Sequence, residues 1–235
     1  MKRYTQKEFD LFPLDNYGRK QCPSGDYTLI TKFPKRCSFD GLCYFGVKCF
    51  FSEQCSFGKC CSFGKCCSFG ERCFFGEHCS FGTDCSFGVD CSFGAECFFC
   101  KFCSFGRFCS FGMDCSFGRF CSFGMDCSFG KCCSFGDRCV FGEFCTFGED
   151  CKCEFGIFQA MYTASGFGSA GRTTYFFHML DDRIYVRCGC FAGTIDAWEN
   201  RVKKTHGFNR YAQAYVMIGG AVRAICQNKR MEDSN

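Results

Sequence analysis

The chain has 235 residues and combines 29 cysteines with 36 phenylalanines, whereas it holds only 3 prolines and 1 tryptophan. A hydrophobic fraction of 47% and an aromatic fraction of 20% exclude an intrinsically disordered chain. The net charge is +4, yet residues 37–156 are mildly acidic and both flanks are basic. A rod that binds nucleic acid needs a basic stripe, so nucleic acid is not an expected partner.

The N-terminus, from Met1 to Glu8, has no apolar run after its basic residues. We therefore expect no signal peptide and no membrane segment, since no stretch approaches the roughly 18 apolar residues that a span requires. These features predict a cytoplasmic protein whose thiols stay reduced. The odd number of cysteines also excludes complete intramolecular pairing.

Residues 1–36 precede the repetitive part of the chain and are expected to form an N-terminal cap. Within them, Tyr27–Thr31 is rich in strand-forming residues and ends shortly before Pro34. This pattern predicts a strand over 27–31 that covers one open end of the following domain.

A six-residue repeat organises residues 37–156. From Cys37 to Cys145 a cysteine falls at every sixth position, which gives nineteen hexads of the form Cys-Ser-Phe-Gly-x-x. The third position is Phe in all nineteen, and the fourth is Gly in sixteen. After Asp150 we expect the register to move by two, so that Cys153–Gly156 is a last, shifted copy. Such a fixed period predicts a solenoid.

Alternation along an extended strand explains the composition of one hexad. Cys and Phe, two residues apart, point to one side and Ser points to the other. Gly then permits the bend, and two polar residues complete the corner. Stacked coils would bury each Phe, which contributes roughly 2–3 kcal/mol, with Cys as a small apolar filler beside the ring.

The pattern of a small residue followed two positions later by a large apolar one resembles the hexapeptide repeat of left-handed β-helix proteins. This resemblance covers residues 37–156 and places Cys37 and Phe39, with their successors, at the inward positions. It implies a mainly β fold with three hexads, about 18 residues, in each coil. Phe in place of the family's aliphatic residues requires a wider interior.

A coil of four hexads, about 24 residues, is the alternative. Charged residues at the two x positions would stack between coils. A coil of 18 residues gives four opposite-sign and three like-sign pairs, whereas a coil of 24 residues gives four opposite-sign and five like-sign pairs. Phe50, Phe74 and Phe98, however, recur at 24. The pattern favours three hexads per coil and leaves four hexads open.

Residues 157–235 are predicted to form a small α+β module. A Gly/Ser/Ala-rich link over 163–171 precedes a hairpin of Thr174–Leu180 and Ile184–Cys190. A helix should begin after Thr194 and stop at Gly207, and a second should cover about 209–228.

This module is similar to uncharacterised bacteriophage and prophage proteins, on the stretch Arg187–Thr194. The similarity implies an origin in a phage or mobile element, with the host cytoplasm as the site of action. It implies no activity.

Acyl transfer is one candidate function, because many hexapeptide β-helices resemble acyltransferases with a His base at a coil corner. Of the three histidines, only His78 lies in the repeat, and no hexad carries an inserted loop. A solvated corner residue is the stronger interpretation of His78, so we expect no catalytic residue and no small-molecule substrate.

Metal binding is a second candidate. The run Cys97, Cys100 and Cys103 spells CxxCxxC, but a cysteine at the Gly position of this repeat creates that spelling automatically. In the C-terminal module, two cysteines and two histidines could form a four-ligand zinc site. They are Cys188, Cys190, His178 and His206. Ordinary strand and turn positions are the stronger interpretation of these residues, and no cofactor is expected.

Surface recognition is the preferred candidate. Five phenylalanines occupy positions that should face outward. They are Phe98, Phe102, Phe108, Phe120 and Phe144. Phe102 and Phe120 are three hexads apart and would stack on one edge of a three-hexad coil. The sequence therefore predicts a non-enzymatic β-solenoid that binds a protein partner or a second copy of itself; a DNA mimic is a lesser alternative.

Overall fold

The computed structural model describes residues 1–166 and 173–232. The chain divides into two compact units, Met1–Glu154 and Phe155–Asn235. Among the described residues, no helix is both long and apolar enough to cross a membrane.

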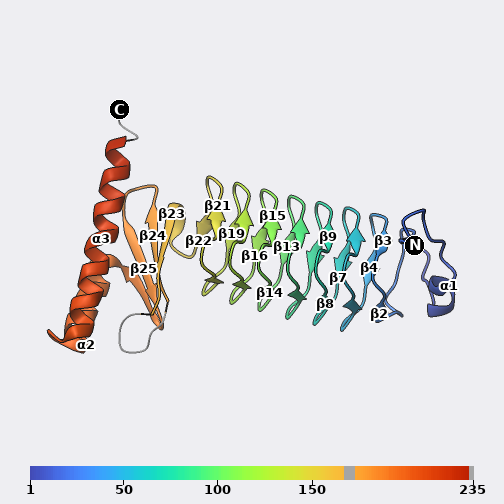
Figure 1. The fold of residues 1–235 in the computed structure, drawn as a ribbon, viewed down its shortest axis with the longest axis horizontal. Helices are drawn as coiled ribbons and strands as arrows, with labels where there is room; N and C mark the ends of the chain where they lie inside the picture. The colour runs from blue at the N-terminus through green and yellow to red at the C-terminus, as the bar shows by residue number, and fades with distance from the viewer. Residues whose placement is uncertain (167–172, 233–235) are drawn as a thin grey trace. The chain divides into compact units, whose positions relative to one another are not determined.

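The first unit is a parallel β-solenoid of about seven turns with about 18 residues per turn, as predicted. Figure 1 shows its coils stacked in a row. Each coil contributes one short strand to each of three parallel sheets, which we call the first, second and third faces. Ser38 pairs with Ser56 and Phe39 with Phe57, so paired residues of one sheet are one full turn apart in the chain.

The three faces contain the following strands. The first face is β1 (Lys20–Cys22), β3 (Cys37–Phe39), β6 (Ser56–Phe57), β9 (Phe74–Phe75), β12 (Ser92–Phe93), β15 (Ser110–Phe111), β18 (Ser128–Phe129) and β21 (Thr146–Phe147). The second is β4 (Tyr44–Phe45), β7 (Ser62–Phe63), β10 (Ser80–Phe81), β13 (Phe98–Phe99), β16 (Ser116–Phe117), β19 (Ser134–Phe135) and β22 (Lys152–Cys153). The third is β2 (Lys32–Phe33), β5 (Phe50–Phe51), β8 (Ser68–Phe69), β11 (Ser86–Phe87), β14 (Ser104–Phe105), β17 (Ser122–Phe123) and β20 (Val140–Phe141).

The alternative of four hexads per coil is wrong. Phe50, Phe74 and Phe98 lie on the third, first and second faces, so their recurrence does not place them in one column. Charged corner residues instead pair at a spacing of three hexads. Lys59 Nζ, for example, lies 2.7 Å from a carboxylate oxygen of Glu77 in the next coil.

The interior consists of three columns of phenylalanine rings. Along a column the rings stack, as in Phe63 and Phe81, whose centroids are 4.8 Å apart with planes 1° apart. Between columns they meet edge to face, as in Phe63 and Phe69 at 5.0 Å and 87°. Both arrangements are favourable for aromatic rings. The ring spacing equals the strand spacing of a sheet, which is why one residue type fills the whole core.

The cysteine ladder does more than fill space. From Cys55 to Cys151, each inward thiol lies where it donates to the carbonyl of a fourth-position residue one coil earlier. Cys67 Sγ lies 3.4 Å from the Gly46 carbonyl, and Cys103 Sγ lies 3.4 Å from that of Gly82. Cysteine is therefore suited to this position because it is apolar and also a weak donor.

The bend of each hexad is not made by its glycine, contrary to the sequence interpretation. Every sixth-position residue from Arg36 to Asp150 has a positive φ near 60°, whereas no hexad glycine does. Glycine is needed at the fourth position because the backbone there lies so close to the backbone of the previous coil that a Cβ atom does not fit. A Cβ on Gly82 would lie 2.7 Å from the carbonyl carbon of Gly64.

The end of the repeat also differs from the prediction. Cys151 is fully buried and Lys152 pairs with Ser134, so the register continues without a shift. Cys153 therefore stands where other hexads have Phe, rather than opening a new copy. The sequence suggested a shift because Glu154–Gly156 mimics the repeat by chance.

The N-terminal residues contribute a first coil. The predicted strand over 27–31 is wrong, because Asp26 makes an isolated bridge to Tyr44 and the strand that follows is β2. Tyr27 stacks on Phe45 at 5.4 Å and on Tyr4 at 5.0 Å, so the N-terminal residues extend one ring column. Helix α1 (Gln6–Asp10) begins at an N-cap Thr5, and its buried Phe9 packs edge to face on Phe33 at 5.4 Å.

The second unit contains an antiparallel sheet in the order β23 (Gly156–Ala164), β24 (Thr174–Met179), β25 (Ile184–Cys188) and β26 (Phe191–Thr194). The predicted hairpin is confirmed by the pairing of β24 with β25. The predicted link over 163–171 is partly wrong, because β23 runs to Ala164; residues 167–171 lie outside the described residues.

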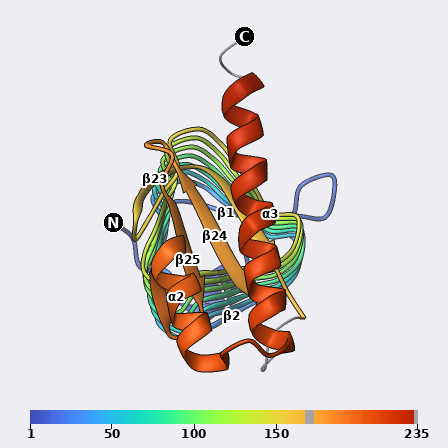
Figure 2. The same ribbon diagram turned by 90° about the vertical axis from the view of Figure 1, so that its left-hand side faces the viewer.

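Two helices cover one face of this sheet, as Figure 2 shows. Helix α2 (Ile195–His206) begins at an N-cap Thr194 and ends at Gly207, as predicted, and α3 spans Arg210–Glu232. Trp198 is buried at the centre of the unit and meets Phe176 edge to face at 5.4 Å.

Candidate partner-binding surface

The corners of the coils present their sixth-position side chains to solvent. We call the corners that follow the first, second and third faces the first, second and third corners. Four of the predicted phenylalanines occupy sixth positions with a left-handed backbone: Phe102, Phe108, Phe120 and Phe144. A left-handed residue costs roughly 1–2 kcal/mol, so these rings are held outward by a strained turn. The fifth, Phe98, projects from the second face.

Phe102 and Phe120 form an exposed stacked pair at the second corner. Their ring centroids are 5.2 Å apart with planes 14° apart, so the two rings stack as their spacing predicts. The Phe102 side chain is 46% exposed and that of Phe120 is 38% exposed. The backbone N–H of Phe102 donates to the Arg119 carbonyl at 3.0 Å, which ties the two coils together at this point.

Cations flank both rings of this pair. Lys101 Nζ lies 5.7 Å from the Phe102 centroid, and the Arg138 guanidinium lies 5.6 Å from that of Phe120. Arg138 occupies the same corner one coil further on. The Phe102/Phe120 edge therefore combines apolar area with positive charge, which favours a partner surface that is apolar and acidic.

The other three predicted residues lie elsewhere on the solenoid. Phe108 and Phe144 are both exposed at the third corner, two coils apart, with Asp126 between them. Phe98 is 51% exposed on a face. All five rings face outward as predicted, but they occupy three separate places and make no single patch.

Sequence reasoning missed further exposed apolar side chains. Phe50 and Phe74 are 52% and 55% exposed at second positions, and they share that position with Phe98, so the signal was present. In the second unit, Phe208 at the turn between α2 and α3 is 92% exposed, and Met217 on α3 is 75% exposed. No periodicity in the sequence marks these two residues.

The predicted zinc site is wrong. His178 pairs with Ile184 whereas Cys188 pairs with Thr174, so the two lie about 13 Å apart along the hairpin. His206 instead stacks on Tyr215 with centroids 5.8 Å apart. Within 1–166 and 173–232, no group of three or more His, Cys, Asp or Glu side chains could hold a metal ion.

His178 has its own environment in the second unit. Its ring is buried, with Nε2 at 3.4 Å from Asp182 and Nδ1 without a hydrogen-bond partner among the described residues. Cys188 accepts a hydrogen bond from the Thr174 hydroxyl at 3.1 Å. Cys190 is exposed in the turn that follows β25.

His78, the one histidine of the repeat, is a half-exposed corner residue with φ 57°. Its Nδ1 lies 3.3 Å from a carboxylate oxygen of Glu96 in the next coil. This contact spans three hexads, as the contact of Lys59 with Glu77 does.

Burial keeps most thiols of the inward ladder away from soluble reactants. The pKa shifts along the ladder have no common direction: hydrogen bonds from the Cys43 and Cys79 thiols lower the pKa of Cys61 to about 4, for example. The neighbouring thiol of Cys55 and then burial raise the pKa of the Cys73 thiol to about 12, although Cys91 acts in the opposite direction. Cys97 and Cys103 are buried on adjacent faces, which separates them as the repeat predicted. The exposed thiols are Cys60, Cys66, Cys132 and Cys190.

No protein-family model matches the chain, and no curated protein matches it. A search of solved structures gives a protein of Parabacteroides merdae described as a "putative glycosyl hydrolase". The two share 10% sequence identity with a TM-score of 0.25, over 64% of this chain and 87% of the other. This likeness is too low to carry any argument about function.

Proposed function

We propose that this protein is a non-enzymatic scaffold that binds a protein partner through the Phe102/Phe120 edge. We also propose that its repeat belongs with the hexapeptide-repeat solenoids, that it acts in the cytoplasm, and that it originates from a bacteriophage or another mobile element. The observation that carries the binding proposal is the exposed ring pair held 5.2 Å apart on a strained corner.

The physical support is that this edge is already organised for binding. Coil-to-coil hydrogen bonds fix the backbone at both residues, and the two rings already stack on each other, so less conformational entropy is lost when a partner covers them. Phenylalanine and arginine are both enriched in protein interfaces relative to the rest of the protein surface. A partner with an apolar residue between carboxylates would match both features.

Affinity capture from a lysate of the source organism tests this proposal when two paired variants are compared. Phe102→Asn/Phe120→Asn removes the edge, and Phe108→Asn/Phe144→Asn is the matched control at the third corner. Asn is chosen because it tolerates the left-handed backbone that all four positions adopt. The double variants should keep the circular dichroism spectrum of the wild type.

The proposal requires that one or more proteins, a second copy included, fall at least about tenfold in the first variant and stay unchanged in the control. Each captured protein is then purified and its Kd measured against all three forms. Equal recovery with both variants would overturn the proposal. Acyl-CoA binding that disappears in His78→Ala would overturn the non-enzymatic part of it.

A further inference from the structure

One ladder of side chains runs along the third corner at the N-terminal end of the solenoid. It consists of Arg19, Arg36, Gln54, Arg72 and Asp90 in successive coils. Positions 36 to 90 follow the regular period, but Lys20 pairs with Cys37, so the first step is one residue shorter. Lys20 N–H also donates to the Arg36 carbonyl at 2.9 Å, which places Arg19 and Arg36 about 4.8 Å apart in the ladder.

This first step places two arginines on neighbouring coils, with the Arg19 guanidinium 5.8 Å from the centroid of the Tyr17 ring. Arg72 has a partner, since its Nε lies 3.8 Å from a carboxylate oxygen of Asp90. Arg36 Nε donates to Gln54 Oε1 at 3.0 Å, a neutral contact that orients the guanidinium and leaves its terminal amino groups available. In the described part of the chain, neither Arg19 nor Arg36 has a carboxylate partner. An anion in the groove would give both arginines a charged partner.

The loop that carries Arg19 is held in one conformation. The Asp15 carboxylate accepts hydrogen bonds from the backbone N–H groups of Tyr17 and Arg19 at 2.8 and 2.9 Å. Its other oxygen accepts one from Gln21 Nε2 at 3.1 Å. The arginine is thus presented by a turn with internal support rather than by a free loop.

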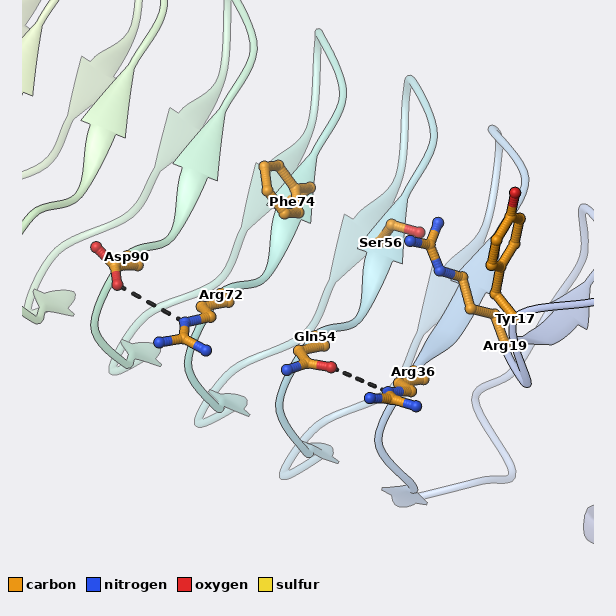
Figure 3. A pocket seen from close by; sticks show the side chains of 8 residues that line it. All are labelled: Tyr17, Arg19, Arg36, Gln54, Ser56, Arg72, Phe74 and Asp90. Atoms are coloured by element: carbon orange, nitrogen blue, oxygen red, sulfur yellow. Dashed lines mark hydrogen bonds and ion pairs between the residues drawn. The ribbon is translucent and has the colours of Figure 1, made fainter.

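A groove of about 660 Å³ lies between this loop and the first face. This volume is within the range of about 300–1,000 Å³ that is typical of small-molecule sites. Figure 3 shows Tyr17 and Arg19 at one end of the groove and Asp90 at the other, with Ser56 and then Phe74 between them.

Phe74 gives the groove an aromatic wall. It interrupts the serine row of the first face, in which Ser56 donates to Ser38 at 3.2 Å and Ser110 donates to Ser92 at 3.1 Å. Its ring is 55% exposed, so its face is available for stacking. Paired arginines and a ring together fit a ligand with an anionic group and a planar group.

The positive charge is local. Beyond Arg72, the sixth positions of the third corner are Asp90, Phe108, Asp126 and Phe144, and none of these is cationic. A long polyanion would meet carboxylates after two coils, whereas a small ligand would not. The lining as a whole holds three arginines and one aspartate.

We propose that this groove binds a small phosphorylated molecule with a planar ring, the chemical class of the mononucleotides. The phosphate lies between Arg19 and Arg36, and the ring stacks on Phe74. This site is separate from the Phe102/Phe120 edge at the second corner, so either can fail without the other.

Titration calorimetry with AMP, adenosine and inorganic phosphate on the full chain tests the site. Arg36→Gln should weaken AMP and phosphate at least about tenfold. Phe74→Ser restores the repeat residue and should therefore fold, and it should weaken AMP at least about fivefold while phosphate stays within about twofold. Arg107→Gln, an arginine on the same corner outside the groove, should leave all three ligands unchanged.

Three results would overturn the proposal. One is the absence of AMP and phosphate binding to the wild type at about 5 mM. Another is AMP binding that survives Arg36→Gln in a variant whose melting temperature matches the wild type. The third is a single-stranded oligonucleotide that binds more tightly than AMP and is weakened by Arg107→Gln, since a strand along the corner would then be the ligand.

Discussion

The fourth and sixth positions of the hexad have different roles, so a glycine should be required at the fourth position and favourable at the sixth. Two substitutions should therefore change the free energy of unfolding in opposite directions. Gly82→Ala adds a Cβ where the backbone of the previous coil lies 2.7 Å away, at both the Gly64 carbonyl carbon and the Lys65 nitrogen. Lys48→Gly removes a side chain from a residue with φ 56° that makes no ion pair among the described residues. If glycine made the bend, as the sequence alone suggests, the second change would bring no gain.

The magnitudes follow from these geometries. Ordinary contact begins near 3.4 Å, so the corner must open by about 0.7 Å around the new methyl group. Both sides are backbone, and Gly82 N–H donates to the Phe63 carbonyl at 2.9 Å, so the strain cannot be relieved by a side chain. Overpacking of this kind costs roughly 2–3 kcal/mol. Lys48→Gly removes about 1–2 kcal/mol of left-handed backbone strain. It also raises the entropy that the chain loses on folding, which costs about 0.5–1 kcal/mol. The free energy of unfolding should therefore rise by roughly 0.5–1 kcal/mol.

Urea unfolding followed by far-ultraviolet circular dichroism measures both free energies. Midpoints are compared only between variants with equal m values, because a solenoid can lose cooperativity along its length. Hydrogen exchange of the corner amides near Gly82 gives a second, local reading. Gly82→Ala within about 0.5 kcal/mol of the wild type, or Lys48→Gly that destabilises, would refute the assignment of roles.

Three further changes probe the interior, the thiols and the N-terminal coil. Phe87→Ala removes a ring that stacks on Phe69 and Phe105 at 4.8 Å and should cost roughly 3–5 kcal/mol in urea unfolding; a loss below about 1 kcal/mol would contradict the ring-column core. Cys66 should react with iodoacetamide in the native protein before its buried neighbour Cys67, as peptide mass spectrometry can measure, and equal rates would be inconsistent with the inward ladder. Hydrogen bonds from Thr28 and then Arg3 lower the pKa of Asp26 to about 2. The ionised carboxylate therefore stabilises the fold fully above the unfolded pKa of about 4, and this stabilisation is lost as the pH falls towards 2. Asp26→Asn should flatten the dependence of the unfolding free energy on pH in that range, and an unchanged slope would count against the contact.

The sequence by itself determined that the repeat forms a β-solenoid with Cys and Phe inside, whereas the number of hexads per coil was decided by the tertiary structure. Period six places Cys and Phe on one side of every strand, and their burial follows from alternation alone, as Cys97 and Phe99 illustrate. It predicted that Phe102 and Phe120 would meet if each coil had three hexads, and the three-hexad coil of the structure brings the two rings together. The helix from Thr194 to Gly207 was set by its local capping residues.

Contacts between coils were decided only in three dimensions. The role of the glycines depends on how closely two corners approach, and the thiols find their acceptors in the previous coil, so neither is visible within one hexad. The zinc prediction failed because strand register separates His178 from Cys188, whatever their spacing in the chain.

The candidate anion site is the clearest example of this limit. Arg19 meets Arg36 one residue out of the regular period, because the first coil is one residue shorter than the others. A period read from the sequence therefore leaves Arg19 out of the ladder. Backbone pairing in the folded chain is what places the two arginines on neighbouring coils.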